Sequence, residues 1–150
     1  MSKAAAARWV EPLYLDASAL VKLFVPESES DALNQALLGA KDVILSDLSL
    51  TEMASALGRR TREGLLAGRH ARRLHREAVK LATSCRHVEL TPPIHRHAER
   101  LLLSLLVPLR ALDALHLASA LDAEAATLVT FDPRLRDAAT ALGLLVAPAG

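Results

Sequence analysis

The sequence predicts an α/β fold with three layers, α/β/α, around a central parallel sheet of about five strands. Five short apolar runs bounded by polar residues or glycine alternate with longer segments of helical spacing. Strands that alternate with helices are typical of a parallel sheet covered on both faces. Hydrophobic residues make up 51% of the chain and aromatic residues only 3%, which favours helices packed through aliphatic side chains. The length of 150 residues suits a single domain over 1–150.

The strands are expected where the apolar runs lie, and the helices between them. The expected strands are 12–15, 43–45 ("VIL"), 87–90 ("HVEL"), 127–131 ("TLVTF") and 143–147 ("GLLVA"). Apolar residues at the helical period predict helices over 18–25, 28–39, 48–63, 67–85, 94–107 and 112–124. A short helix is expected after Pro133, because a first helical turn tolerates proline, whereas Pro92 and Pro93 end the third strand before the next helix.

The composition indicates a soluble protein of the cytoplasm. The longest dense apolar run, "LLLSLLVPL" at 101–109, is shorter than the roughly 20 residues that span a bilayer, so no membrane partner is expected. Arg8 interrupts the N-terminal segment before the apolar region of a signal peptide can develop. The lone Cys85 has no cysteine partner for a disulfide or a zinc cluster, which fits a reducing compartment.

Four acidic residues stand where expected strands give way to helices. Asp16 follows the first strand and Asp132 the fourth, and parallel strands deliver their carboxyl ends to one edge of the sheet, so these two should be neighbours. Glu52 lies near the start of the helix after the second strand. Asp113 begins an apolar helix, one turn before His116. All four acids are therefore candidates for one site.

Each acid also has a structural interpretation. Asp16 and Asp132 could cap the helices that follow them, and Ser49 with Glu52 matches a capping box. Asp113 is harder to explain in this way, because its neighbours are leucine and alanine and a buried carboxylate needs a cation or a hydrogen-bond donor.

Four acids at one edge of a sheet would repel one another. Such a cluster is stable only if some pKa values rise or a divalent cation neutralises it. Oxygen ligands favour Mg²⁺ or Mn²⁺, whereas zinc would recruit histidine or cysteine, and the six histidines form no metal-ligand pattern.

The blocks that contain these acids, "YLDASALVKLFVPESES", "SLTEMASALGRR", "LRALDALHLASAL" and "LVTFDPRL", resemble the PIN-domain family, and most closely its VapC-type toxins. The resemblance implies a PIN-like fold and a Mg²⁺- or Mn²⁺-dependent ribonuclease that acts on tRNA or other structured RNA. Asp16, Glu52, Asp113 and Asp132 match the family's acidic quartet, and Ser18 matches a hydroxyl residue that often follows the first acid.

Roles within this set can be suggested from rigidity. All four acids are candidates to hold the metal: Asp16, Asp132 and Asp113 by direct contact, because rigid elements fix ligands best, and Glu52 directly or through a ligand, while it orients or activates the attacking water. Ser18 could bond a ligand carboxylate or the substrate phosphate. His116 could support the site or simply pack in its helix.

The resemblance also implies partners. One is an antitoxin whose C-terminal segment covers the active-site groove and inserts a basic side chain among the carboxylates, where it can replace the charge of the metal. Another is a second copy of the chain, since family members usually form homodimers. Leu33, Leu37 and Leu38 are candidates for the dimer contact, although an ordinary core face would explain them as well.

The net charge of +1 announces no nucleic-acid partner, but one segment is strongly basic. Arg69, Arg72, Arg73, Arg76 and Lys80 recur with the spacing of one helical face. Such a basic stripe could follow the phosphates of RNA, or it could be an ordinary solvated face.

Three other functions compete with a ribonuclease. A phosphotransferase of the haloacid-dehalogenase type would need a second aspartate where Ser18 stands. A PIN-like module could bind RNA or a protein without cutting. A structural α/β domain could use all four acids as caps.

Overall fold

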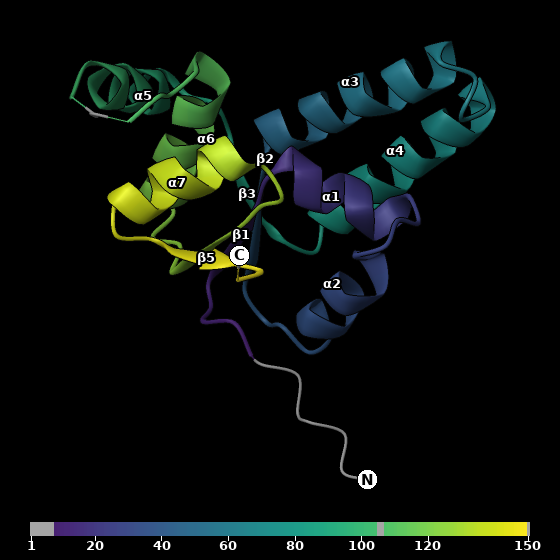
Figure 1. Cartoon of the computed structure of the whole chain (residues 1–150), viewed down its shortest axis with the longest axis horizontal. Coiled ribbons are helices and arrows are strands. Elements are labelled where there is room, and N and C mark those ends of the chain that lie inside the picture. Colours follow the sequence, from purple (N-terminus) through teal and green to yellow (C-terminus); the bar gives the residue numbers. More distant parts are fainter. Residues whose placement is uncertain (1–7, 105–106, 150) are drawn as a thin grey trace, which may run out of the picture.

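A computed structural model describes residues 8–104 and 107–149 (Figure 1). Residues 105–106 of the predicted helix 94–107 lie outside this part, as do residues 1–7. The elements are β1 (Leu13–Leu15), α1 (Ala17–Phe24), α2 (Ser30–Leu37), β2 (Val43–Ser46), α3 (Asp47–Arg62), α4 (Gly68–Ala82), β3 (Arg86–Val88), α5 (Pro92–Ser104), α6 (Ala111–Asp122), β4 (Thr127–Val129), α7 (Pro133–Ala141) and β5 (Leu145–Ala147).

The five strands form one sheet in the order β3-β2-β1-β4-β5, and every neighbouring pair is parallel. The predicted fold class is confirmed. β1 lies at the centre, where Leu13 pairs with both Val43 of β2 and Thr127 of β4. The residues that follow β1 and β4 therefore leave the sheet side by side, at the edge where ligands bind in such folds.

Helices cover both faces of the sheet. Figure 1 shows α1, α3 and α4 on one side and α5, α6 and α7 on the other. Leu13 and Leu15 of β1 pack into the first layer, together with Leu20 of α1 and Leu74 of α4. Tyr14, between them in sequence, points into the second layer, because successive side chains of a strand face opposite ways. Both layers are filled by Leu and Ala, as the composition predicts.

The element boundaries differ from the predictions by a few residues. α5 begins at Pro92 rather than at 94, because the first N–H groups of a helix have no partner within it and proline lacks only such a group. β4 ends at Val129, two residues earlier than predicted. The early end releases Thr130 from the strand, and its side chain then becomes part of the site described below.

The predicted dimer patch is partly wrong. Leu33 is only 2% exposed and belongs to the core, so it cannot contact a second copy. Leu37 packs against the same core, and Leu38 alone is well exposed, at 78%. Across residues 8–104 and 107–149, no helix combines the length and apolar character needed to cross a membrane.

Candidate active site

A cavity of about 670 Å³ opens at the carboxyl edge of the sheet. All four acids predicted from the sequence line it, and each comes from a different part of the fold: Asp16 at the end of β1, Glu52 in α3, Asp113 in α6 and Asp132 before α7. Ser18 and His116 line the same cavity. The structure thus brings together residues that are up to 116 positions apart in sequence.

Asp16 is held in place by three hydrogen bonds. Its Oδ1 accepts from the Ser18 hydroxyl at 2.7 Å and from the Ala19 N–H at 2.9 Å, and its Oδ2 accepts from the Thr130 hydroxyl at 2.5 Å. The bond to Ala19 caps α1, so the capping interpretation is correct for Asp16. Burial raises the pKa of Asp16, while nearby His116 and the Thr130 bond work in the opposite direction.

Two hydroxyl groups join the ends of β1 and β4. Ser18 accepts the Phe131 N–H at 2.8 Å while it donates to Asp16. Thr130 accepts the Asp132 N–H at 3.0 Å while it donates to Asp16. Both hydroxyls therefore fix the position of one acid relative to the loop that carries another. The sequence interpretation missed Thr130; its only sequence signal is a polar residue within an apolar run, two positions before Asp132.

Glu52 belongs to a buried chain of polar groups. Its Oε1 lies 2.5 Å from His116 Nε2, and His116 Nδ1 lies 2.7 Å from the Tyr14 hydroxyl. The hydroxyl in turn lies 2.8 Å from Ser46 Oγ. His116 is 3% exposed, and it contacts an acid of the site as well as packing in its helix.

The Tyr14 hydroxyl lies between two possible partners in this chain, His116 and Ser46. Burial raises the pKa of Tyr14, so its hydroxyl stays protonated at neutral pH and has one hydrogen to donate. Glu52 accepts from Nε2–H of His116, and the Tyr14 hydroxyl can donate either to Nδ1 of His116 or to Ser46. The sequence interpretation missed Tyr14, because nothing in a three-residue apolar strand indicates which polar groups the Tyr14 hydroxyl contacts.

Ser46, rather than Ser49, caps the helix that carries Glu52. The Ser46 side chain accepts the Ser49 N–H at 3.2 Å, so α3 starts at Asp47 and the predicted capping box is wrong. Ser49 instead donates to the Leu15 carbonyl at 2.8 Å, which ties α3 to the end of β1. Glu52 therefore lies beyond the first turn of α3, where a carboxylate has no capping task.

Asp113 and Asp132 share one arginine. Arg110 donates through Nε to Asp113 Oδ2 at 3.1 Å, and its Nη2 lies 3.5 Å from Asp113 Oδ1 and 3.2 Å from Asp132 Oδ2. Asp113 is 4% exposed, and Arg110 is the cation that such a carboxylate needs. Asp132 also caps α7 through the Arg134 N–H at 2.9 Å, as predicted. The sequence interpretation missed Arg110.

The donor set fits a hard divalent cation, because four carboxylates supply oxygen ligands and no cysteine lines the cavity. Within residues 8–104 and 107–149, however, no three acidic, histidine or cysteine side chains are already arranged around a metal position. Each acid is instead engaged by a group of the protein: Asp16 by hydroxyls, Glu52 by His116, and Asp113 and Asp132 by Arg110. Asp16, Asp113 and Asp132 are the residues that would hold the ion.

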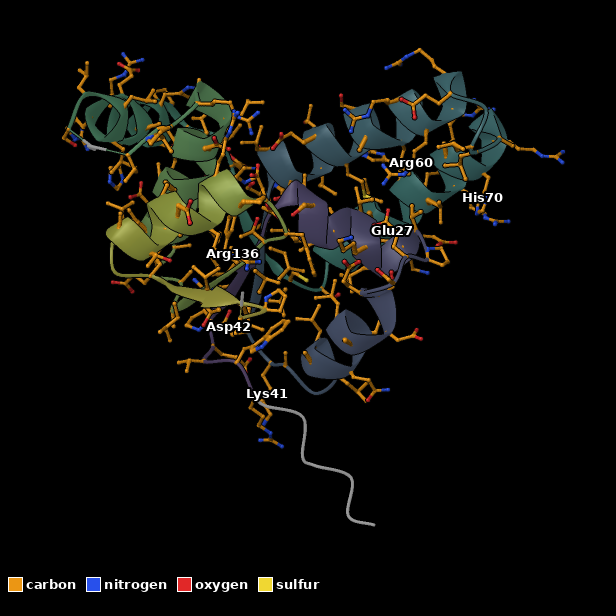
Figure 2. All side chains as sticks on the ribbon, in the orientation of Figure 1. Glu27, Lys41, Asp42, Arg60, His70 and Arg136 are labelled. Carbon is orange, nitrogen blue, oxygen red and sulfur yellow. The ribbon has the colours of Figure 1, made fainter. Side chains whose placement is uncertain are left out.

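The opposite end of the cavity is basic. Lys22 of α1 and Arg59 and Arg60 of α3 line it. Glu27 joins two of them, accepting from Lys22 at 2.6 Å and from Arg60 at 2.7 Å. Figure 2 shows Glu27 and Arg60 close together beside α1 and α3. One cavity thus presents acids at the sheet edge and cations farther along α3.

The predicted basic stripe lies elsewhere. Its five members are all exposed on α4, and none of them lines the acidic cavity: Arg69, Arg72, Arg73, Arg76 and Lys80. Three of them surround a separate hollow of about 440 Å³ together with His70, which Figure 2 places on the outer part of the α3–α4 hairpin.

The chain is similar to known proteins in sequence and in fold. The PIN domain family matches residues 13–141. Ribonuclease VapC46 of Mycobacterium tuberculosis is 39% identical over 138 residues, which cover 89% of this chain and 95% of that protein.

Two solved structures have the same fold. One is Mycobacterium tuberculosis VapC20, described as a Sarcin-Ricin loop cleaving toxin, with a TM-score of 0.69 and 20% identity over 89% of this chain and 96% of that one. The other is VapBC2 from Rickettsia felis, bound to a DNA fragment from their promoter, with a TM-score of 0.61 and 14% identity over 89% of this chain and 96% of that one.

Proposed function

This chain belongs to the PIN-domain family, and from that premise we propose that it is an endoribonuclease that requires Mg²⁺ or Mn²⁺ and acts as the toxin of a toxin–antitoxin pair. The observation that carries the proposal is the convergence of Asp16, Glu52, Asp113 and Asp132 in one cavity. Capping accounts for Asp16 and Asp132, but it does not account for Glu52, which lies past the helix start and faces the same cavity. We take the nuclease domain to extend over 1–150 and to act in the cytoplasm.

The residues of the site would have different roles in phosphodiester hydrolysis. A divalent ion bound by Asp16, Asp113 and Asp132 would supply charge neutralisation at the phosphoryl oxygens and a more acidic water. Glu52 would accept the proton of the attacking water. His116 occupies its Oε1, and no other described residue hydrogen-bonds to Oε2, which leaves that oxygen to receive the proton. His116 and Tyr14 would hold the carboxylate in this orientation.

RNA would enter from the basic end of the cavity. Arg59 is exposed at the cavity wall, seven residues along α3 from Glu52, which corresponds to about 10 Å of helix. A phosphate next to the one being cut would therefore meet Arg59 and its neighbours. The α4 stripe remains part of the proposal as an outer contact for a longer RNA, because it is exposed and basic.

The partner proposed for the toxin is an antitoxin whose C-terminal segment covers the cavity. The structure of VapBC2 from Rickettsia felis contains a chain with the same fold as this one, which supports a partner of that kind. The acids offer a binding place for a basic side chain. A homodimer also remains a proposal, with Leu38 as its exposed apolar residue.

The test is cleavage of total RNA by the purified chain after removal of any bound partner, with Mg²⁺ or Mn²⁺ against EDTA and with Asp16→Asn beside the parent. We expect cleavage that needs the metal and is lost in the variant. Mapping of the fragment ends would then identify the target RNA.

Absence of cleavage by a folded protein that binds metal would overturn the nuclease proposal and favour a PIN-like module that binds RNA or a protein without cutting. Replacement of Arg59 by Glu and, separately, of Arg73 by Glu would locate the RNA. A larger loss of RNA affinity in Arg59→Glu places the bound strand along the cavity, and a larger loss in Arg73→Glu places it along α4.

A further inference from the structure

Arg110 occupies an unusual position among the four acids. Its guanidinium reaches two carboxylates that come from different elements, Asp113 of α6 and Asp132 before α7. Both acids are among those proposed to hold the divalent ion. The two ion pairs therefore engage both oxygens of Asp113 and one oxygen of Asp132.

We propose that Arg110 exchanges between two anions during the reaction: it pairs with Asp113 and Asp132 in the protein alone, and it turns to the substrate phosphate when a divalent cation takes those carboxylates. This inference rests on the proposed function. It assigns to Arg110 both a competition with the metal and a contact with the RNA.

Competition follows from the distances. Nη2 of Arg110 lies 3.5 Å from an oxygen of Asp113 and 3.2 Å from an oxygen of Asp132, so it stands between the two side chains. A divalent cation held by Asp113 and Asp132 would need carboxylate oxygens that Arg110 now contacts. Its charge would lie close to the guanidinium, and two positive charges at short separation repel each other. Arg110 and the cation therefore exclude each other.

Arg110 can leave this position, because its side chain forms no hydrogen bond or ion pair with any described residue other than Asp113 and Asp132. The side chain is 58% exposed, whereas that of Asp113 is 5% exposed. The start of α6 does not depend on the guanidinium, since the Arg110 backbone N–H also donates to Asp113, at 3.3 Å. A released arginine at the rim of the cavity lies beside the acids, where the scissile phosphate must bind, and its planar fork suits phosphate oxygens.

The experiment compares Arg110→Ala with a matched control, Arg134→Ala. Arg134 lies two residues after Asp132 and is exposed, and its side chain forms no ion pair among the described residues, so its loss changes the net charge equally without breaking a contact. Mn²⁺ binding is measured by titration with electron paramagnetic resonance detection, without RNA. Cleavage of a mapped RNA is measured at saturating Mn²⁺.

We expect Arg110→Ala to bind Mn²⁺ about three- to tenfold more tightly than the parent, because the variant lacks the ion pairs that compete with the metal for Asp113 and Asp132. It should cut RNA at least about tenfold more slowly, because the contact with the phosphate is lost. Arg134→Ala should change both quantities by less than about twofold. Arg110→Lys should bind Mn²⁺ with an intermediate affinity and recover part of the rate, since it keeps the charge but not the fork.

Tighter Mn²⁺ binding together with slower cleavage by Arg110→Ala supports the exchange. Unchanged or weaker Mn²⁺ binding by Arg110→Ala overturns it, and so does a rate equal to that of the parent. Failure of both the parent and the variant to bind Mn²⁺ would overturn this inference together with the proposed function. Tight binding by both with no cleavage of any RNA would overturn the proposed function and the phosphate contact, while the affinity difference would still report the competition.

Discussion

The two halves of the acidic site are held in different ways. Asp16 and Glu52 are fixed by hydrogen bonds from groups built into the fold, namely the hydroxyls of Ser18 and Thr130, the Ala19 N–H and the imidazole of His116. Asp113 and Asp132 are joined by the charged side chain of Arg110, which is more than half exposed. One half is built into the ends of β1 and α3, and the other half depends on a side chain that can leave.

The difference indicates which groups are ready for a ligand. Neutral hydroxyl donors can keep their bonds to a carboxylate while its remaining lone pairs bind a cation, so the first half needs no rearrangement. A guanidinium must withdraw before a cation can take its place, so the second half must rearrange. The site thus combines a rigid anchor with an exchangeable partner, and the predictions below test whether the halves behave in these two ways.

The largest effect is expected from the rigid half. Asp16→Asn should lower the rate of RNA cleavage by about 10³-fold or more, because it removes a fixed charge from the centre of the site. Asp132→Asn should lower it by only about 10- to 100-fold, since Asp132 is partly exposed and a water can replace one of its oxygens. Single-turnover cleavage of a mapped RNA measures both. Equal losses would show that the two halves contribute alike.

A second prediction concerns Thr130, which connects the halves. Thr130→Val keeps the shape of the side chain but removes the donor to Asp16 and the acceptor of the Asp132 N–H. We expect metal affinity and cleavage rate to fall together by about 10- to 100-fold, as for other groups that orient metal ligands. Calorimetric titration with Mn²⁺ measures the affinity. Thr127→Val is the control, since the Thr127 hydroxyl bonds the distant Val10 carbonyl. An effect of equal size there would point to a general loss of stability.

A third prediction separates positioning from packing at His116. His116→Leu should reduce the cleavage rate by about tenfold, because Glu52 loses its partner, whereas His116→Gln should recover part of the rate. Tyr14→Phe breaks the other bond of the imidazole and leaves the contact with Glu52 in place. It should lower the free energy of unfolding by about 1 kcal/mol with a smaller loss of rate. A rate loss in Tyr14→Phe as large as that in His116→Leu would contradict a direct role for the His116–Glu52 contact.

The sequence predicted the acids of the site but not the arginine that joins two of them. The period of the apolar residues located the five strands and seven helices within a few positions, and the parallel order then required Asp16 and Asp132 to be neighbours. Arg110 could not be found in this way, because its approach to Asp132, 22 residues away, depends on how the segment before α6 runs across the sheet edge. The α4 residues show a similar limit. Their spacing predicted a common face, but periodicity cannot tell which way that face points relative to the site.

The smallest effect is expected in the dependence of stability on pH. This measurement tests Asp16, which belongs to the rigid half of the site. Burial raises the pKa of Asp16 above its ordinary value of 3.8, so the folded chain binds this proton more tightly than the unfolded chain does. The resulting stability is fully present below the unfolded pKa and is lost as the pH rises through the folded pKa. Asp16→Asn cannot titrate at this position. The Tm of the parent minus that of the variant should therefore fall as the pH rises from about 4 toward neutral. Thermal unfolding in EDTA, followed by circular dichroism, measures the difference. A parent that instead gains stability relative to the variant would mean that the bonds from Ser18, Ala19 and Thr130 outweigh burial and hold Asp16 as an ionised ligand.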